Sequence, residues 1–541
     1  MKQRKDVPQK IIILYAIIIF GLFLVIPMVA ILGKSFLTDA GLTFEIYQRL
    51  LLEKNIGQAF LNSVVISSVS AFITNLFAFL IAYTINYTNL NPKMKKVISG
   101  LVMLPMLLPT ITYGYALIYT FGKQGLLTKL LGVQLLDVYS AQGLIFGYII
   151  YTLPISFMLI NNAMNYVDKK FMVVSRLMGD SGWKTFRNTI LRPLTANLFI
   201  SFIQSFTLSF TDYGIPAALA GNIDLLSTRL YSVMLGSLPD FNVGSAISII
   251  MLIPSLVSIA LISYLQKFNI RYGKISQVEL KKNKVRDEIL GTLSMLIIVV
   301  VISMFGVIFI IPFVEQWPYR MSFTMGNLVE MFSDSVLLEV YKNSLFVAFM
   351  TAVFGTLLAY STALFSARRG EHRRFGKIAD SVSLITNAIP GMVLGVAYLL
   401  VFRGTALHNT FLILIVCDII HYFSSPYLMM KGGLEKLNAS WEVTAKLMGD
   451  TWLKTVLRII TPNVMKTILE VFEYYFVNAM VTVSAVIFLA GTKTMVVTAK
   501  IKELQHFAKF NEIFVLSILI FCTNLAVKTI VRIVGKKIGG K

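Results

Sequence analysis

The sequence is poor in cysteine and in charged residues. Only two cysteines, Cys417 and Cys522, occur among its 541 residues, and both lie inside apolar runs. A disulfide framework or a cysteine-based metal cluster is therefore not expected. Charged residues make up 14% of the chain, against about 25% in soluble globular domains. This shortage, together with a hydrophobic content of 56%, excludes an ordinary soluble protein.

The sequence contains instead a series of long apolar runs. A membrane-spanning helix needs about 20 apolar residues, and Ile11–Leu32, Ile289–Phe313 and Ile513–Val534 reach that length. The polar breaks between such runs predict about twelve spans, at residues 11–33, 58–86, 97–121, 140–163, 194–220, 243–266, 289–314, 342–366, 378–402, 410–431, 463–490 and 512–535. We therefore expect an all-α polytopic protein embedded in a lipid bilayer.

Basic residues outnumber acidic ones, with 49 Lys and Arg against 27 Asp and Glu and a formal net charge of +22. Such an excess can mark a nucleic-acid partner. Here, however, the basic residues cluster in alternate loops, for example 169–192, 267–286 and 431–466, which is the bias that sets membrane topology. We expect no nucleic-acid partner, a multi-pass protein of the inner or plasma membrane, and both termini in the cytoplasm.

The two halves of the chain repeat one another. Three patterns recur in the same order: Asn-Ser at 62 and 343, Pro-x4-Gly-x-Ala at 109 and 390, and Leu-Met-Gly-Asp at 177 and 447. The first two recur after 281 residues and the third after 270, a difference of 11. This difference places one insertion in the predicted outward loop 122–139, whose counterpart is 403–409.

The repeat predicts a first six-helix unit over 1–266, a basic cytoplasmic linker over 267–288 and a second six-helix unit over 289–541. Each unit starts and ends on the same side of the membrane, so the two are parallel and related by an axis along the membrane normal. The expected fold is a pseudo-dimer of six-helix repeats around a central path.

The Leu-Met-Gly-Asp block lies in the largest predicted cytoplasmic loop of each half. In the second half this loop runs from Trp441 to Pro462. Its periodicity predicts a short amphipathic helix, a stop at Gly449 and a second helical stretch before the next span. A short helix at the membrane surface, flanked by rigid spans, can transmit a push from a soluble partner into the helix bundle.

The second loop resembles the EAA loop of binding-protein-dependent ABC importers, which has Glu-Ala-Ala, then Gly, then a Pro at the head of the next span. Glu442, Ala445, Gly449 and Pro462 match that pattern, while Val443 and Thr444 replace the expected residues between Glu442 and Ala445. The first loop keeps the Gly and the Pro, but residues 172–175 read Met-Val-Val-Ser, and its Pro193 lies one residue further from the Gly.

The resemblance implies a type I importer permease that works by alternating access. Its two loops dock on a separate ABC ATPase, acting as a dimer, and an extracytoplasmic solute-binding protein delivers the cargo. The coupling residues that it implies are Gly179, Asp180, Glu442, Ala445, Gly449 and Asp450.

The chain carries no nucleotide-binding motif of its own. A phosphate-binding loop needs Gly-x4-Gly-Lys-Ser/Thr, and the nearest candidate, Gly179–Thr185, has the wrong spacing and places Trp183 before Lys184. We therefore expect a transport subunit rather than an enzyme, with no cofactor of its own and with ATP and Mg²⁺ bound by the partner subunit.

The cargo is indicated by resemblance alone. Asn387–Tyr398 and Met480–Leu489 resemble fused permeases for ferric iron and 2-aminoethylphosphonate, which are similar in turn to permeases for thiamine and polyamines. Ferric iron is the first expectation, and the other three solutes stay open.

Polar residues within spans are costly and therefore mark candidates for function. Asp212 lies beside two helix breakers, Gly214 and Pro216, which would expose backbone carbonyls to a cavity. The residues that we expect to line the translocation path are Asp212, Tyr213, Thr482 and Ser484. The alternative is an Asp212 that is satisfied within helix packing or lies nearer the outer surface.

Two further pairs, Glu470 with Glu473 and Asp418 with His421, lie one helical turn apart, and the second pair is close enough to hydrogen-bond internally. Neither provides the four ligands of a structural metal site, so no metal is expected. Packing or gating is the first interpretation, and contact with substrate is the second. The histidines expected in solvated loops are His372, His408 and His506.

Two other classes of function stay open. A secondary transporter of the major-facilitator kind also pairs two parallel six-helix halves, but it would work without ATP. A membrane-embedded enzyme acting on lipids would need a convergent set of catalytic residues, and the sequence shows none.

Overall fold

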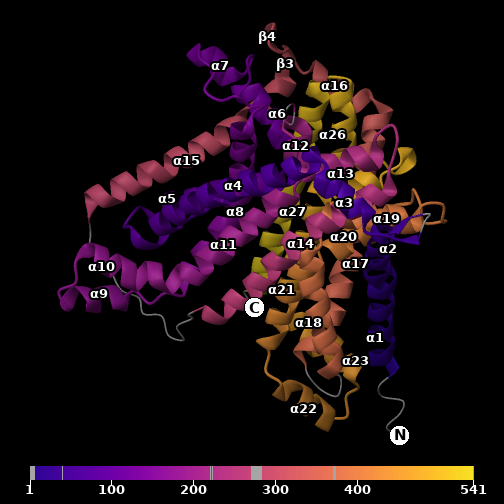
Figure 1. Cartoon of the computed structure of the whole chain (residues 1–541). Helices are drawn as coiled ribbons and strands as arrows, with labels where there is room; N and C mark the ends of the chain where they lie inside the picture. Colours follow the sequence, from indigo (N-terminus) through magenta and orange to yellow (C-terminus); the bar gives the residue numbers. More distant parts are fainter. Residues whose placement is uncertain are drawn as a thin grey trace. The chain divides into compact units, whose positions relative to one another are not determined.

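The computed structural model describes residues 7–38, 41–219, 221, 223–269, 283–368 and 373–539. These residues are almost entirely helical (Figure 1), as predicted. Within these ranges the strands form two short antiparallel hairpins, β1 (Leu37–Thr38) with β2 (Gly41–Leu42) and β3 (Val314–Gln316) with β4 (Arg320–Phe323). Most of the predicted linker 267–288, and His372, lie outside the described residues.

The chain divides into two compact units. The unit that we call the first-repeat unit comprises Leu51–Arg229 and Ile253–Asn327, and the second-repeat unit comprises Met1–Leu50, Leu230–Leu252 and Leu328–Lys541. The first span of each repeat thus belongs to the unit built mainly from the other repeat. The domain boundaries drawn from the sequence stay a prediction.

The first-repeat unit contains ten helices among its described residues. They are α4 (Lys54–Tyr87), α5 (Pro92–Val102), α6 (Thr110–Phe121), α7 (Leu126–Leu131), α8 (Ala141–Asn165), α9 (Lys170–Leu177), α10 (Gly182–Phe186), α11 (Arg192–Thr211), α12 (Gly214–Leu219) and α15 (Lys284–Ile310). Among the described residues, α13 (Leu226–Leu235) and α14 (Phe241–Leu265) are divided between the units, and α3 (Glu45–Leu52) and α16 (Gly326–Ser333) each extend two residues into the first-repeat unit.

The second-repeat unit contains the remaining described helices. They are α1 (Val7–Phe20), α2 (Ile26–Phe36), α3 (Glu45–Leu52), α16 (Gly326–Ser333), α17 (Ser335–Ala367), α18 (Arg373–Ala388), α19 (Gly391–Phe402), α20 (Phe411–His421), α21 (Ser424–Glu435), α22 (Ser440–Leu447), α23 (Trp452–Thr455), α24 (Thr461–Asn463), α25 (Met465–Val481), α26 (Val497–His506) and α27 (Phe510–Gly539).

Eight helices among the described residues are long and apolar enough to cross a membrane, and two bent pairs raise the number to ten. The bent pairs are α18 with α19, at 101°, and α20 with α21, at 58°. The other two predicted spans are interrupted. A 3-10 turn at Leu104–Leu107 separates α5 from α6, and α25 ends after 17 residues at Val481. The repeats therefore rely on broken helices where the sequence predicts continuous ones.

The repeated Asn-Ser pair has the same structural role in both repeats. In the first, the Asn62 side chain donates to the Asp224 carbonyl at 3.1 Å, and the Ser63 hydroxyl accepts from the N–H of Leu226, at the start of α13, at 3.0 Å. In the second, the corresponding bonds reach the Met495 carbonyl at 3.2 Å and the first N–H of α26 at 2.7 Å. The pair anchors the short helix that follows the fifth span.

The first span lies against second-repeat helices. It consists of α1, a π-helical segment at Gly21–Val25 and α2. The Tyr398 hydroxyl donates to the Phe23 carbonyl at 2.6 Å, and the rings of Phe20 and Phe423 meet edge to face at 4.7 Å. These contacts hold the span to α19 and to the bend after α20.

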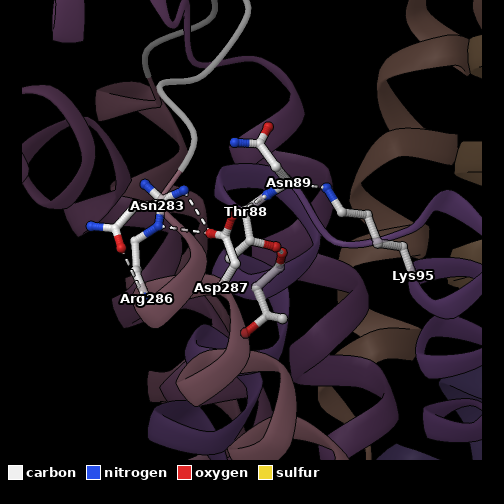
Figure 2. Close-up of polar contacts among 7 residues, drawn as sticks. Thr88, Asn89, Lys95, Asn283, Arg286 and Asp287 are labelled. Atoms are coloured by element: carbon white, nitrogen blue, oxygen red, sulfur yellow. Dashed lines mark hydrogen bonds and ion pairs between the residues drawn. The ribbon is translucent and has the colours of Figure 1, made fainter.

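The first span of the second repeat, α15, lies in turn against first-repeat helices. Its start is fixed by Asp287, which accepts from Arg286 at 2.7 Å and from the N–H of Asn89 at 3.2 Å (Figure 2). Nearby, the Lys95 ammonium donates to the Thr88 carbonyl at 2.6 Å and so satisfies the end of α4 (Figure 2).

Candidate functional site

The loop around the first Leu-Met-Gly-Asp block, residues 170–191, contains a turn at a glycine; we call it the first coupling loop, after the role that the resemblance implies. After α9, Gly179 adopts φ +78°. The N–H of Asp180 donates to the Ser175 carbonyl at 3.1 Å, and the N–H of Gly179 donates to the Arg176 carbonyl at 3.0 Å. This pair of bonds is a Schellman motif, which needs a left-handed residue and so favours glycine.

The second coupling loop, residues 440–460, has the same turn. Gly449 adopts φ +81° after α22. The N–H of Asp450 donates to the Ala445 carbonyl at 2.9 Å, and the N–H of Gly449 donates to the Lys446 carbonyl at 3.1 Å. A Cβ on Gly179 or Gly449 would meet nothing within 4 Å. Both positions therefore need glycine for its backbone conformation and not for space.

The turns carry a pair of exposed apolar side chains. Leu177 and Met178 are 82% and 78% exposed, and Leu447 and Met448 are 83% and 80% exposed. Single exposed apolar residues are ordinary. The same exposed Leu-Met pair recurs at the same place in both repeats.

An ion pair closes each turn. In the first loop the Asp180 carboxylate contacts the Lys184 ammonium at 2.6 Å and accepts from the Ser175 hydroxyl at 2.7 Å. The hydrogen bond from Lys184, and after it the one from Ser175, lowers the pKa of Asp180. In the second loop Asp450 and Lys454 form the equivalent pair. The aspartates named from the sequence thus stabilise the loops themselves.

The departure of the first loop from the EAA pattern has a structural counterpart. In the second loop Glu442 contacts Arg368, at the end of α17, at 3.6 Å. In the first loop the corresponding residue is the buried Met172, and the counterpart of Arg368 is Tyr87, whose ring carries the Lys169 ammonium at 5.4 Å. An ion pair in one repeat is replaced by a cation–π contact in the other.

A π-helical segment leads from each loop into the fifth span, at Arg187–Leu191 and at Val456–Ile460. The helix before it has five residues in the first repeat and four in the second. This difference accounts for the extra residue between Gly179 and Pro193. Short π-helical segments inside longer helices occur frequently at functional sites.

The fifth span of the first repeat breaks at Asp212. Its carboxylate accepts from the N–H of Ile215 at 2.9 Å, at the start of α12, and it also accepts from the N–H of Gly214 and the hydroxyl of Thr110. Asp212 therefore caps α12 and ties it to the start of α6. Tyr213 beside it is buried.

The second repeat has the same contact between the third and fifth spans, but the small and the larger residue have exchanged places. A Cβ on Gly214 would clash with the Thr110 hydroxyl, whereas a Cβ on Gly391 would lie 2.5 Å from the Ser484 hydroxyl. Gly391 is the counterpart of Thr110, and Ser484 is the counterpart of Gly214. The Thr482 hydroxyl lies 2.7 Å from the Tyr422 hydroxyl. One partner of each pair must be glycine because the third and fifth spans touch here.

The remaining polar residues named from the sequence fall into two environments. Glu470 is exposed on α25, and Glu473 is half-buried within electrostatic reach of Lys528. Asp418 and His421 do not form the internal hydrogen bond that their spacing allows, since both carboxylate oxygens and the imidazole Nδ1 are buried without a partner among the described residues. The described residues contain no group of three or more His, Cys, Asp or Glu that could hold a metal ion.

The chain matches a known family in both repeats. The family model described as "Binding-protein-dependent transport system inner membrane component" matches residues 74–272 and 355–540. Each match contains one coupling loop and one broken fifth span.

Several curated proteins are similar over most of the chain or over one repeat. "Putative ferric transport system permease protein FbpB 1" of Haemophilus influenzae is 27% identical over 90% of this chain and 78% of its own. "Ferric transport system permease protein FbpB" of Actinobacillus pleuropneumoniae is 27% identical over 90% of this chain and 73% of its own. The Escherichia coli protein PotC, a spermidine/putrescine transport system permease, is 25% identical over 44% of this chain and 87% of its own.

A solved structure of a bacterial alginate ABC transporter in complex with an alginate-bound periplasmic protein is 17% identical, with a TM-score of 0.41. The similarity covers 51% of this chain and 98% of that one.

Proposed function

The chain belongs to the family of inner membrane components of binding-protein-dependent transport systems, and we propose that it is the permease of an ATP-driven importer of ferric iron. The main support for this proposal is that the coupling loops of the two repeats have the same turn geometry and each carry an exposed Leu-Met pair. The ferric permeases that are similar over 90% of the chain support iron as the cargo.

In the proposed mechanism, a separate ATPase dimer binds both coupling loops from the cytoplasm, where both termini of the chain lie. When ATP closes the dimer, the loops are drawn together and the π-helical segments pass the movement into the fifth spans. The bundle opens outward, and an extracytoplasmic solute-binding protein releases ferric iron into a path lined by the broken segments around Asp212, Tyr213, Thr482 and Ser484. ATP hydrolysis and Mg²⁺ binding belong to the partner subunit.

The test is ATP-dependent ⁵⁵Fe(III) uptake by proteoliposomes that contain the chain, its ATPase and its solute-binding protein. Burying a Leu or Met side chain contributes about 2 kcal/mol, so replacing both Leu447 and Met448 by Ser is expected to weaken ATPase binding about 100-fold or more. Uptake should fall in proportion. Val285→Ser, at an exposed apolar residue of α15 before the predicted span 289–314, is the control and should transport normally.

The same assay separates the alternatives. Uptake of polyamine, 2-aminoethylphosphonate or thiamine in place of iron would keep the importer and change its cargo. Iron uptake that continues without ATP, and that ignores the loop substitutions, would show a secondary transporter and would contradict the proposal.

A further inference from the structure

The second repeat buries an ionisable pair whose hydrogen-bonding groups are unused. Asp418 is fully buried on α20. Both of its carboxylate oxygens, and Nδ1 of His421 one turn later, lack a hydrogen-bond partner among the described residues. Buried polar groups are almost always paired, because an unpaired one costs about 1–3 kcal/mol, and more if it is charged. Such unpaired groups indicate a ligand that engages them at another stage of the transport cycle.

His421 lies at the junction of the third and fifth spans, and Asp418 precedes it by one helical turn on α20, within electrostatic reach of Tyr398. A Cβ on Gly391 would be 3.1 Å from His421 Nε2 and 2.5 Å from the Ser484 hydroxyl, so both groups lie against the start of α19. The hydroxyl of Tyr422, the next residue, contacts Thr482 at the break after α25. One imidazole nitrogen, His421 Nε2, and one hydroxyl, that of Ser484, thus lie beside Gly391, each from a broken span.

In the first repeat the buried acid is Asp212, which lies at the break after α11, the fifth span, and not on the fourth span. The counterparts of Asp418 and His421, 270 residues earlier, are Tyr148 and Tyr151. Asp212, at the break after α11, lies within electrostatic reach of Tyr148. Asp212 is engaged by backbone N–H groups and Thr110, whereas Asp418 has no such partner among the described residues. The acids of the two repeats therefore differ: the Asp212 carboxylate is already hydrogen-bonded, whereas the Asp418 carboxylate is available to coordinate a ligand.

We propose that Asp418 and His421, with the hydroxyls of Tyr422 and Ser484, form a transient binding site for the ferric ion on its way through the bundle. The proposal rests on the proposed function. Hard cations prefer carboxylate and other oxygen donors, and imidazole suits iron. Two strong donors are too few to trap the ion, which suits a transport step, since a bound ion must also be able to leave.

The experiment measures ⁵⁵Fe(III) uptake and ATP hydrolysis together in proteoliposomes of the complete transporter. Asp418→Asn keeps the shape of the side chain and removes its charge. We expect uptake to fall about tenfold or more while ATP hydrolysis stays within about twofold of wild type. Asp418→Glu should recover part of the uptake. Cys417→Ala, at the neighbouring buried position, is the packing control and should transport normally.

Thermal unfolding of the purified variants distinguishes ligand binding from a structural role. Asp418→Asn removes a buried unpaired carboxylate, so its melting temperature should equal or exceed that of wild type. Normal iron uptake by Asp418→Asn, or a lower melting temperature alongside lost uptake, would overturn the proposed site and leave the proposed function intact. A wild-type transporter that carries another solute and no iron would overturn both.

Discussion

At the scale of single residues, the same close contact between two spans is made in both repeats, but the glycine lies on the opposite span in each. Thr110 faces Gly214 in one repeat, and Gly391 faces Ser484 in the other. The third and fifth spans touch at this point, so only one member of each pair can carry a side chain. Gly355 likewise accepts the ring of Tyr475 in the second repeat, where the first has Thr74 and Ser205.

This exchange predicts a compensated double variant. Gly391→Thr alone should overpack the junction and lower stability by about 1–3 kcal/mol. Adding Ser484→Gly recreates the pair found in the first repeat and should restore most of the loss. Thermal unfolding of the purified variants measures both effects. If the double variant is no more stable than the single one, the two side chains do not share the space inferred here.

Residue patterns could predict some of these contacts and not others. The glycines at 179 and 449 and the repeated Asn-Ser pairs are visible in the sequence, because each acts through its own backbone or within a repeated block. The contact of Glu442 with Arg368 is not visible, since it joins residues 74 apart through the fold. The unpaired state of Asp418 depends on what every neighbouring helix offers, which no local pattern records.

At the scale of elements, the joint between each coupling loop and its fifth span is a π-helical segment. Arg187–Leu191 and Val456–Ile460 occupy the same place in the two repeats. The sequence predicts continuous α-helix at these positions. A π-helical turn contains one extra residue, and this change is too small to alter the apolar periodicity from which helices are predicted. The break after Val481 escapes the sequence because the residues around it stay mostly apolar. The break within residues 97–121 does have a sequence signal, since Pro105 opens the 3-10 turn and Pro109 precedes α6.

The π-helical joint predicts an uncoupled deletion variant. Leu457 lies within the second segment and is 59% exposed, so deleting it should return the segment to α-helix with little loss of packing. We expect ATP hydrolysis to stay within about twofold of wild type while iron uptake per ATP falls about fivefold. Simultaneous measurement of phosphate release and ⁵⁵Fe(III) uptake checks this. Unchanged uptake per ATP would show that the joint transmits force equally well without the extra residue.

At the scale of the whole molecule, the first span of each repeat packs against helices of the other repeat. The Tyr398 hydroxyl donates to the Phe23 carbonyl, and the Asp287 carboxylate accepts from the N–H of Asn89, in the turn after α4. The repeated motifs predict two six-helix halves and their order, which the family matches at 74–272 and 355–540 support. The exchange of first spans leaves no such trace, because it depends on packing between helices that lie far apart in the sequence.

In the proposed transporter, the two coupling loops bind a separate ATPase subunit. The most direct measurement is affinity purification of the tagged chain from native membranes, followed by mass spectrometry. We predict that the wild-type chain recovers an ATPase subunit and that Gly179→Val combined with Gly449→Val loses it, because a β-branched residue resists the left-handed turn. Recovery of the chain without any ATPase, together with transport that needs no ATP, would contradict the account.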